Sequence, residues 1–448
     1  MTPARKAAFL VLLRVKRESS FAVELLHSPL LEGLSPVDRN LAQEIVLGVL
    51  RWQSLLDESF AALLQKPLSR LDPEVVIALR MASYQLAFLD RIPAHAIVNE
   101  TVELIKKSGK RSASGLVNAV TRKLAALRNT LPMKERGLAH DFAHPQWLVE
   151  RWVAQFGHDK THAICAYDQQ VPATALRITA PEQEDELRSA GVHLAPGTLM
   201  KNARIVTSGD VTRTRLFSSG QIAIQDEGSQ LVAALVGAGQ RILDCCAAPG
   251  GKTAAIAMAQ PHSRIFATDI HAHRARVLRK IASQPNVHVF AADARQLPFV
   301  ADFDRILADV PCSGTGTLAR NPEIKWRLKP EDLADLQARQ IAILTSALQH
   351  VAPGGRIVYS SCSLEAEENK DVIEKALKNC SEFQIVPMRE ELAKLKNSGA
   401  LVWPDVETLL SGNFLRTLPG VHPCDGFFAA VIERTTKDTK GYYESTSG

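Results

Sequence analysis

The pattern of apolar positions divides the chain into regions with different periods. Up to about residue 130, apolar residues recur at a spacing of three to four, as in "LAQEIVLGVLRWQSLLDESFAALL", and breakers such as "HSP", "LSP" and "RIP" separate these runs. This spacing is typical of amphipathic helices, and no strand-like alternation interrupts it. Within "LSPVDRNLAQEIV", Ser35 and Pro36 are expected to be the cap and first-turn residues of one helix. The pattern predicts an all-helical domain over residues 1–140.

Short segments follow a further amphipathic helix, "HPQWLVERWVAQFG". They read "ATALRITA", "GVHLAPG", "ARIVTSG" and "IAIQDEG", and glycine and proline separate them. Such short apolar segments with intervening turn residues predict a small mixed α/β linker domain over residues 145–232.

Beyond about residue 235, strand-like and helical patterns alternate. The strand-like segments are short, β-branched and apolar: "RILDCCAA", "SRIFATDI", "VHVFAADA", "FDRILADVP" and "GRIVYSSCS". Buried parallel strands have this composition, so we expect a doubly wound, Rossmann-like sheet over residues 233–436, followed by a disordered tail over 437–448. Ligands of such sheets bind outside the carboxyl ends of the strands. Polar residues at strand ends are therefore the candidates for a site.

Charge is distributed unevenly along the 448 residues, whose net charge is +5. Residues 1–140 hold 20 Lys or Arg against 13 Asp or Glu, and residues 101–140 alone hold nine basic and two acidic residues. A basic surface of this kind attracts polyanions, nucleic acid first. A solvated helical face without a partner is the alternative.

Two further features restrict the class of protein. No run of about eighteen uncharged apolar residues occurs, so we expect no membrane partner. The seven cysteines form no CxxC pair and no ligand spacing for zinc, which favours reduced thiols in a cytoplasmic protein without a metal.

A glycine-rich turn marks a candidate cofactor pocket. In "LDCCAAPGGKT", Gly250 and Gly251 allow close approach of the backbone to a ligand at a helix N-terminus, although neither GxGxxG nor a P-loop is present. Asp269 ends the second strand, nineteen residues beyond Gly250, where a carboxylate can accept hydrogen bonds from ribose hydroxyls. Asp293 ends the third strand and could bind an adenine amino group. Each aspartate alone is an ordinary turn or cap residue, but the series favours an adenosine-containing cofactor.

Several motifs resemble those of a known family. "CAAPGGKT", "ATDI", "ADVPCSGTGTLARNPEIKW", "YSSCSLEAEEN" and "LRTLPGVHPCDGFFAAVIER" are similar to the successive motifs of the S-adenosylmethionine-dependent RNA cytosine-5 methyltransferases. "DRNLAQEIVLGVLRW" and "RIPAHAIVNETVELIKK" resemble the RNA-binding antitermination factor NusB. The resemblance covers nearly the whole chain. It implies a multidomain fold with an all-α NusB-like domain, a small α/β RNA-binding linker domain and a C-terminal Rossmann-like methyltransferase domain.

The resemblance also implies a cofactor, a substrate and a site. The cofactor would be S-adenosyl-L-methionine, and the substrate a cytidine of 16S, small-subunit, ribosomal RNA, methylated by a cytoplasmic monomer. The implied cofactor-binding residues are Cys246, Ala247, Ala248, Pro249, Gly250, Gly251, Lys252, Asp269, Asp293 and Asp309. For Lys252 the sequence leaves open a contact with a carboxylate or the cofactor, a lowered thiol pKa, or a solvated side chain.

Cytosine methylation requires a nucleophile, because carbon 5 becomes reactive only after a thiolate adds to carbon 6. Asp309 ends the fourth strand and Cys312 follows it, while Cys362 ends the fifth, and strands four and five can be neighbours. If the family roles apply, Cys362 is the nucleophile, Cys312 assists product release and Asp309 hydrogen-bonds the base. In "NPEIKWR", Lys325, with Trp326 and Arg327, suits contact with RNA, and a Trp326 that simply packs is the alternative.

Other interpretations stay open. A DNA cytosine-5 methyltransferase would use Cys312 as the nucleophile, and a non-catalytic RNA-binding assembly factor would keep the fold as a scaffold. A dinucleotide oxidoreductase is disfavoured by the missing GxGxxG. Cys362 alone could be a buried, inert thiol. The glutamates after Cys362 are expected to begin the next helix, at the positive end of its dipole.

Overall fold

A computed structural model of the chain describes residues 2–18, 20–127 and 136–436. The tail predicted to be disordered, 437–448, lies outside these residues. The chain divides into two compact units: Met1–Val171 with Leu318–Leu328, and Pro172–Thr317 with Lys329–Gly448. The segment Leu318–Leu328 thus belongs to the unit of the N-terminal helices, although it follows the Pro-Cys motif in the sequence.

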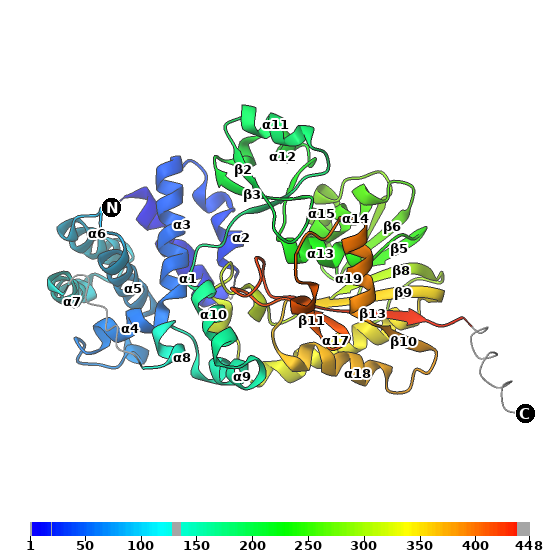
Figure 1. The fold of residues 1–448 in the computed structure, drawn as a ribbon. Helices are drawn as coiled ribbons and strands as arrows, with labels where there is room; N and C mark the ends of the chain where they lie inside the picture. Colours follow the sequence, from blue (N-terminus) through cyan, green and yellow to red (C-terminus); the bar gives the residue numbers. More distant parts are fainter. Residues whose placement is uncertain (1, 19, 128–135, 437–448) are drawn as a thin grey trace, which may run out of the picture. The chain divides into compact units, whose positions relative to one another are not determined.

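The described part of the first unit is helical (Figure 1). Its α-helices are α1 (Pro3–Glu18), α2 (Ala22–Leu26), α3 (Pro36–Arg51), α4 (Gln53–Ala61), α5 (Pro73–Phe88), α6 (Ala94–Lys107), α7 (Ser114–Ala126), α8 (Leu138–Asp141), α9 (Gln146–Phe156), α10 (His158–Asp168) and α16 (Ile324–Arg327). The predicted cap of α3 is confirmed, because Ser35 Oγ accepts a hydrogen bond from the Asp38 amide at 3.1 Å and Pro36 opens the helix. Helices α3 and α5 pack closely at Gly48, where a Cβ would lie 1.9 Å from the Tyr84 ring.

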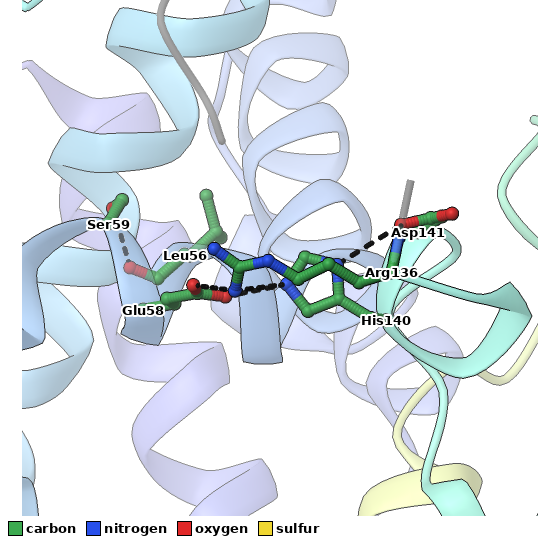
Figure 2. A network of polar contacts seen from close by, with 6 residues as sticks. All are labelled: Leu56, Glu58, Ser59, Arg136, His140 and Asp141. Atoms are coloured by element: carbon green, nitrogen blue, oxygen red, sulfur yellow. Dashed lines mark hydrogen bonds and ion pairs between the residues drawn. The ribbon is translucent and has the colours of Figure 1, made fainter. Parts of the chain in front are cut away.

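A polar network joins α8 to α4 within this unit (Figure 2). The Glu58 carboxylate accepts hydrogen bonds from Arg136 Nη1 at 2.5 Å and pairs with His140 Nε2 at 2.7 Å. The hydrogen bond from His140 and the charge of Arg136 hold the pKa of Glu58 below its ordinary value. Because these side chains are partly exposed, the network contributes only about 1 kcal/mol or less.

The second unit begins with a small antiparallel sheet. Its strands are β1 (Ala175–Arg177), β2 (His193–Pro196), β3 (Ala203–Ser208) and β4 (Ala223–Ile224), in the order β2-β3-β1-β4. Helices α11 (Glu182–Ser189) and α12 (Arg215–Ser218) lie between the strands in sequence, and α13 (Glu227–Leu235) follows them. The predicted boundary at residue 232 falls within α13. Short strands mixed with helices are the architecture expected for the linker region.

A nine-stranded mixed sheet follows, in the order β11-β12-β13-β9-β8-β5-β6-β7, with β10 paired to β13. Its strands are β5 (Arg241–Asp244), β6 (Arg264–Asp269), β7 (Val287–Ala291), β8 (Phe303–Asp309), β9 (Val351–Ser361), β10 (Phe383–Val386), β11 (Leu410–Ser411), β12 (Phe414–Arg416) and β13 (Phe428–Arg434). The five predicted strands are β5 to β9, and all pair in parallel. β13 closes the sheet antiparallel to β9.

Helices cover both faces of this sheet. Successive residues of a strand point to opposite faces, so two neighbouring residues pack against different helices. The connecting helices are α14 (Gly251–Ala259), α15 (Ala272–Ile281), α17 (Asp332–Leu348), α18 (Lys370–Leu377) and α19 (Met388–Asn397). Ile242 packs in one core with residues of α13, α14 and α19, whereas its neighbour Leu243 packs in another with residues of α17 and α18. The predicted doubly wound architecture is confirmed. No helix in the described ranges is long and apolar enough to cross a membrane.

The register of the central strands brings the predicted site residues to one edge. β8 and β9 are parallel neighbours, and Asp309 lies opposite Ser360. The carboxyl ends of the two strands therefore lie side by side, as the sequence predicted for strands four and five. Cys312 and Cys362 both follow these ends.

Candidate active site

The turn after β5 permits close approach of a ligand. Gly250 has a φ of 120°, and a Cβ there would lie 3.0 Å from Leu278 Cδ1. Both the conformation and the packing therefore require glycine. Gly251 begins α14, and a Cβ added to it would meet only the Gln225 amide nitrogen, at 3.9 Å. The backbone at this helix N-terminus is open to a ligand that carries negative charge.

Carboxylates follow three adjacent strands beside this turn. Asp269, at the end of β6, is 4% exposed, and its Oδ1 accepts a hydrogen bond from the His271 amide at 2.9 Å. Asp293, two residues beyond β7, is hydrogen-bonded and ion-paired with Arg295 at 2.7 Å, which holds its pKa below the ordinary value. Both predicted carboxylates lie at the same sheet edge, since the Ala292 amide donates to the Asp269 carbonyl at 3.1 Å.

A third carboxylate, Asp244, was not selected from the sequence. It ends β5, is 1% exposed and accepts a hydrogen bond from Thr253 Oγ1 at 2.7 Å. Burial raises its pKa to about 7, so a proton or a nearby cation stabilises it at neutral pH. Its position at a strand end is the same signal that selected Asp269, and it could have been found in this way.

Lys252 and Asp309 form an ion pair at the centre of the site. Lys252 Nζ donates to Asp309 Oδ2 at 2.8 Å, and Ser360 Oγ donates to Asp309 Oδ1 at 2.7 Å. Burial lowers the pKa of Lys252, but the charge and hydrogen bond of Asp309 outweigh it, so that the pKa lies above its ordinary value. The negative charge of a Cys362 thiolate acts in the same direction. Lys252 is thus a cation near Cys362. No residue close to Cys362 in the sequence was an obvious candidate for this cation.

The two candidate cysteines lie next to each other. Their sulfur atoms are 3.3 Å apart, within the reach of a thiol hydrogen bond. This hydrogen bond, burial and the charges of Cys362 and Glu368 together raise the pKa of Cys312 well above its ordinary value. Cys312 therefore holds its proton at neutral pH, and its protonated sulfur lies beside the sulfur of Cys362. The other five cysteines are also free thiols.

The expectation that Lys325 of "NPEIKWR" contacts RNA is wrong, because this side chain is buried. Lys325 is 1% exposed, and burial lowers its pKa to about 7 against the opposing charge of Asp168. Trp326 Nε1 donates to the Leu50 carbonyl at 2.5 Å, and Arg327 Nη2 donates to the Val15 carbonyl at 3.0 Å. The segment packs inside the first unit, because residues distant in sequence supply the partners that the local pattern lacks.

The glutamates after Cys362 lie at the start of a short 3-10 helix, and Glu367 and Glu368 occupy its first turn. Glu365 and Glu368 are both fully buried, and the short 3-10 helix η6 (Ala366–Glu368) precedes α18. α18 begins at Lys370, directly after this 3-10 helix, and the two buried glutamates are not solvated. Ser313, Ser363 and Gln340 bind Glu368 instead. The acidic run gave no local signal of burial, since its partners come from other strand ends and from α17.

Comparison with known proteins accounts for each of these regions. Residues 234–433 match the family described as 16S rRNA methyltransferase RsmB/F, residues 2–126 match the NusB family, and residues 144–209 match the ferredoxin-like domain of RsmF/B-like methyltransferases. The crystal structure of PH0851 aligns with a TM-score of 0.81 at 22% identity over 97% of this chain and 99% of that chain. This last likeness concerns the fold alone.

Two curated relatives extend the match over most of the sequence. The probable ribosomal RNA small subunit methyltransferase B of Bacillus subtilis is 31% identical over 454 residues, covering 97% of this chain and 99% of the relative. The ribosomal RNA small subunit methyltransferase B of Pseudomonas syringae is 37% identical over 362 residues, covering 77% and 80%. The fold, the strand-end site and these matches define the class, a methyltransferase that acts on ribosomal RNA. The chain belongs to the 16S rRNA methyltransferase RsmB/F family.

Proposed function

We propose that the protein transfers a methyl group from S-adenosyl-L-methionine to carbon 5 of a cytidine in 16S ribosomal RNA, with Cys362 as the nucleophile. The observation that carries the proposal is the 3.3 Å separation of the Cys312 and Cys362 sulfur atoms at neighbouring strand ends. The Lys252–Asp309 ion pair extends this arrangement toward the glycine turn. The names of the curated relatives support the choice of small-subunit RNA.

The residues at the sheet edge fit the cofactor. S-adenosyl-L-methionine presents an amino group, ribose hydroxyls and an adenine amine, and the carboxylates Asp244, Asp269 and Asp293 are acceptors for such donors. The turn at Gly250 and the N-terminus of α14 suit its carboxylate. When bound, the cofactor supplies an electrophilic methyl group on a sulfonium.

Side chains of the protein carry out the other steps of the reaction. The Cys362 thiolate adds to carbon 6 of cytosine, and the electron pair of the 5,6 double bond moves to carbon 5, which takes the methyl group. The positive charge of Lys252 stabilises the attacking thiolate. Asp309 accepts hydrogen bonds from the protonated ring nitrogen and the amino group, since each carboxylate oxygen has a further lone pair available beside Lys252 or Ser360.

Cys312 assists the release of the product. After solvent water accepts the proton of carbon 5, the electron pair of that C–H bond forms the 5,6 double bond. The pair of the bond between Cys362 and carbon 6 then returns to the Cys362 sulfur. The raised pKa of Cys312 keeps a proton within hydrogen-bond reach of that sulfur. A protonated Cys312 therefore stabilises the departing thiolate.

The basic helices of the first unit support an RNA partner. Exposed basic side chains follow one another along α6 and α7 and between them: Lys106, Lys107, Arg111, Arg122 and Lys123. Only some of this charge is neutralised locally, as by the pair of Lys106 with Glu103 at 3.0 Å. Such a surface attracts the phosphate backbone, with an affinity that falls as salt rises.

Single-cysteine variants test the assignment. Cys362→Ala is expected to abolish methylation of an unmodified 16S RNA, whereas Cys312→Ala is expected to accumulate a protein–RNA adduct that survives denaturing electrophoresis. Cys380→Ala is the matched control, because this half-buried thiol lies outside the site and its variant should methylate normally. An adduct in Cys362→Ala in place of Cys312→Ala would assign the nucleophile to Cys312. Absence of S-adenosyl-L-methionine binding to the unaltered protein would favour the scaffold interpretation.

A further inference from the structure

A buried carboxylate lies behind both thiols. Glu368, at the end of η6, is fully buried, and its two oxygens accept four hydrogen bonds. Oε1 accepts from the Ser313 amide at 2.8 Å and from Gln340 Nε2 at 2.9 Å. Oε2 accepts from the hydroxyl groups of Ser313 and Ser363, the latter at 2.5 Å. A buried carboxylate is stable only when hydrogen-bond donors satisfy its oxygen atoms. The carboxylate and its donors therefore form one rigid group.

The donors of this group are the residues that directly follow the two cysteines. Ser313 is adjacent to Cys312 and Ser363 is adjacent to Cys362, and their hydroxyl groups are themselves 3.0 Å apart. The buried hydroxyl of Tyr359, on β9, donates to the Glu368 carbonyl at 2.6 Å and anchors the carboxylate to the sheet. A single side chain therefore joins the loops that carry both sulfur atoms.

We infer that Glu368 is a positioning residue that sets the separation and orientation of the Cys312 and Cys362 thiols. The inference rests on the proposed two-cysteine reaction, and Glu368 acts in it only through Ser313 and Ser363. Addition to carbon 6 requires the nucleophilic sulfur in a near-attack position, and a displacement of about 1 Å costs on the order of 100-fold in rate. The charge of Glu368 also contributes to the raised pKa of Cys312, after the hydrogen bond of Cys362 and burial.

Glu368→Gln tests the inference, since it keeps the shape of the side chain but removes the charge and one acceptor oxygen. We expect kcat for RNA methylation to fall on the order of 100-fold, with the RNA KM and the S-adenosyl-L-methionine Kd unchanged within about twofold. Glu374→Gln, the same substitution on the exposed face of α18, is the control and should retain full activity. Equal kcat for both variants would overturn the inference.

A second measurement separates this inference from the proposed function. In a Cys312→Ala background, Glu368→Gln should slow the formation of the covalent RNA adduct on the order of 100-fold. If Cys312→Ala alone forms no adduct, the proposed reaction fails. If the adduct forms equally fast with and without Glu368→Gln, the reaction stands and the positioning role fails.

Serine variants keep the inference falsifiable if Glu368→Gln folds poorly. Ser313→Ala and Ser363→Ala each remove one hydroxyl donor and leave the carboxylate in place. Each should lower kcat about tenfold and shift the pH dependence of Cys312 alkylation, measured by mass spectrometry, with S-adenosyl-L-methionine binding retained. Unchanged kcat and alkylation profiles in both variants would contradict the role.

Discussion

The loops that carry the two cysteines are held in different ways, although their sulfur atoms are 3.3 Å apart. After Cys362 the chain stays at its own sheet edge, where Asn369 Nδ2 donates to the carbonyls of Ser363 at 2.9 Å and Glu365 at 2.7 Å. After Cys312 the chain forms the 3-10 helix η5 (Thr315–Thr317) and continues as Leu318–Leu328, which belongs to the first unit.

The partners of the two segments differ in their distance along the sequence. Within the first unit, Arg51 Nη2 donates to the Ala319 carbonyl at 3.1 Å, and Glu323 Oε1 accepts from the Ala22 amide at 2.8 Å. Asn369 thus ties the chain after Cys362 to its near neighbours in sequence, whereas Leu318–Leu328 depends on helices from the first part of the sequence.

The largest effect is expected for Gly316→Ala, on the Cys312 side. A Cβ there would lie 2.2 Å from the Gly426 carbonyl oxygen, and the Gly316 amide donates to the Cys362 carbonyl at 2.9 Å. Because backbone must move, we expect a loss of about 1–3 kcal/mol in the free energy of unfolding and on the order of 100-fold in kcat. Denaturant titration and methylation assays measure both. Gly115→Ala, at an open helical position, should change stability by no more than about 0.5 kcal/mol.

Asn369→Ala tests the Cys362 side of the comparison. It removes two donated hydrogen bonds and the acceptor of Ser361 Oγ, which lies at 2.5 Å, and leaves buried polar groups unpaired. The expected loss in the free energy of unfolding is about 1–2 kcal/mol, below that of Gly316→Ala. Alkylation of Cys362 should accelerate more than that of Cys312, as measured by mass spectrometry at matched times. Equal acceleration of both thiols would show that Asn369 does not act mainly on the Cys362 side.

The smallest effect is expected for Lys325→Met, within the segment that follows Cys312. The buried amine has a pKa of about 7 in the folded protein, whereas the unfolded chain retains the ordinary value near 10.4, so Lys325 destabilises the fold most below pH 7. The apolar variant should be more stable at pH 6, and the difference should decrease as pH rises from 7 toward 10. Thermal unfolding at several pH values measures this trend. A gain that does not vary with pH would contradict a buried, charged Lys325.

Much of the fold could be predicted from local pattern. The strands β5 to β9 were evident because buried parallel strands are short, β-branched and bounded by turn residues. The carboxyl-end rule then selected Asp269, Asp309 and Cys362 as candidates, and the resemblance supplied the roles of Asp309 and Cys362. Asp244 was missed although the same rule applied to it. Glu368 could not be found in this way, because an acidic run is normally solvated and nothing in "EAEEN" indicates burial.

The sequence by itself determined which residue types stand at the strand ends and that helices cover a parallel sheet, since periodicity and turn chemistry are local properties. Only the tertiary structure decided which of these residues meet. Lys252 binds Asp309, which lies 57 positions further along the sequence. Glu368 binds both Ser313, 55 positions before it, and Ser363, five positions before it. Lys325 lies in a segment whose charged residues suggested a surface. Packing against residues distant in sequence buries it instead. Strand order and packing create contacts, burial and pKa shifts that no local pattern specifies.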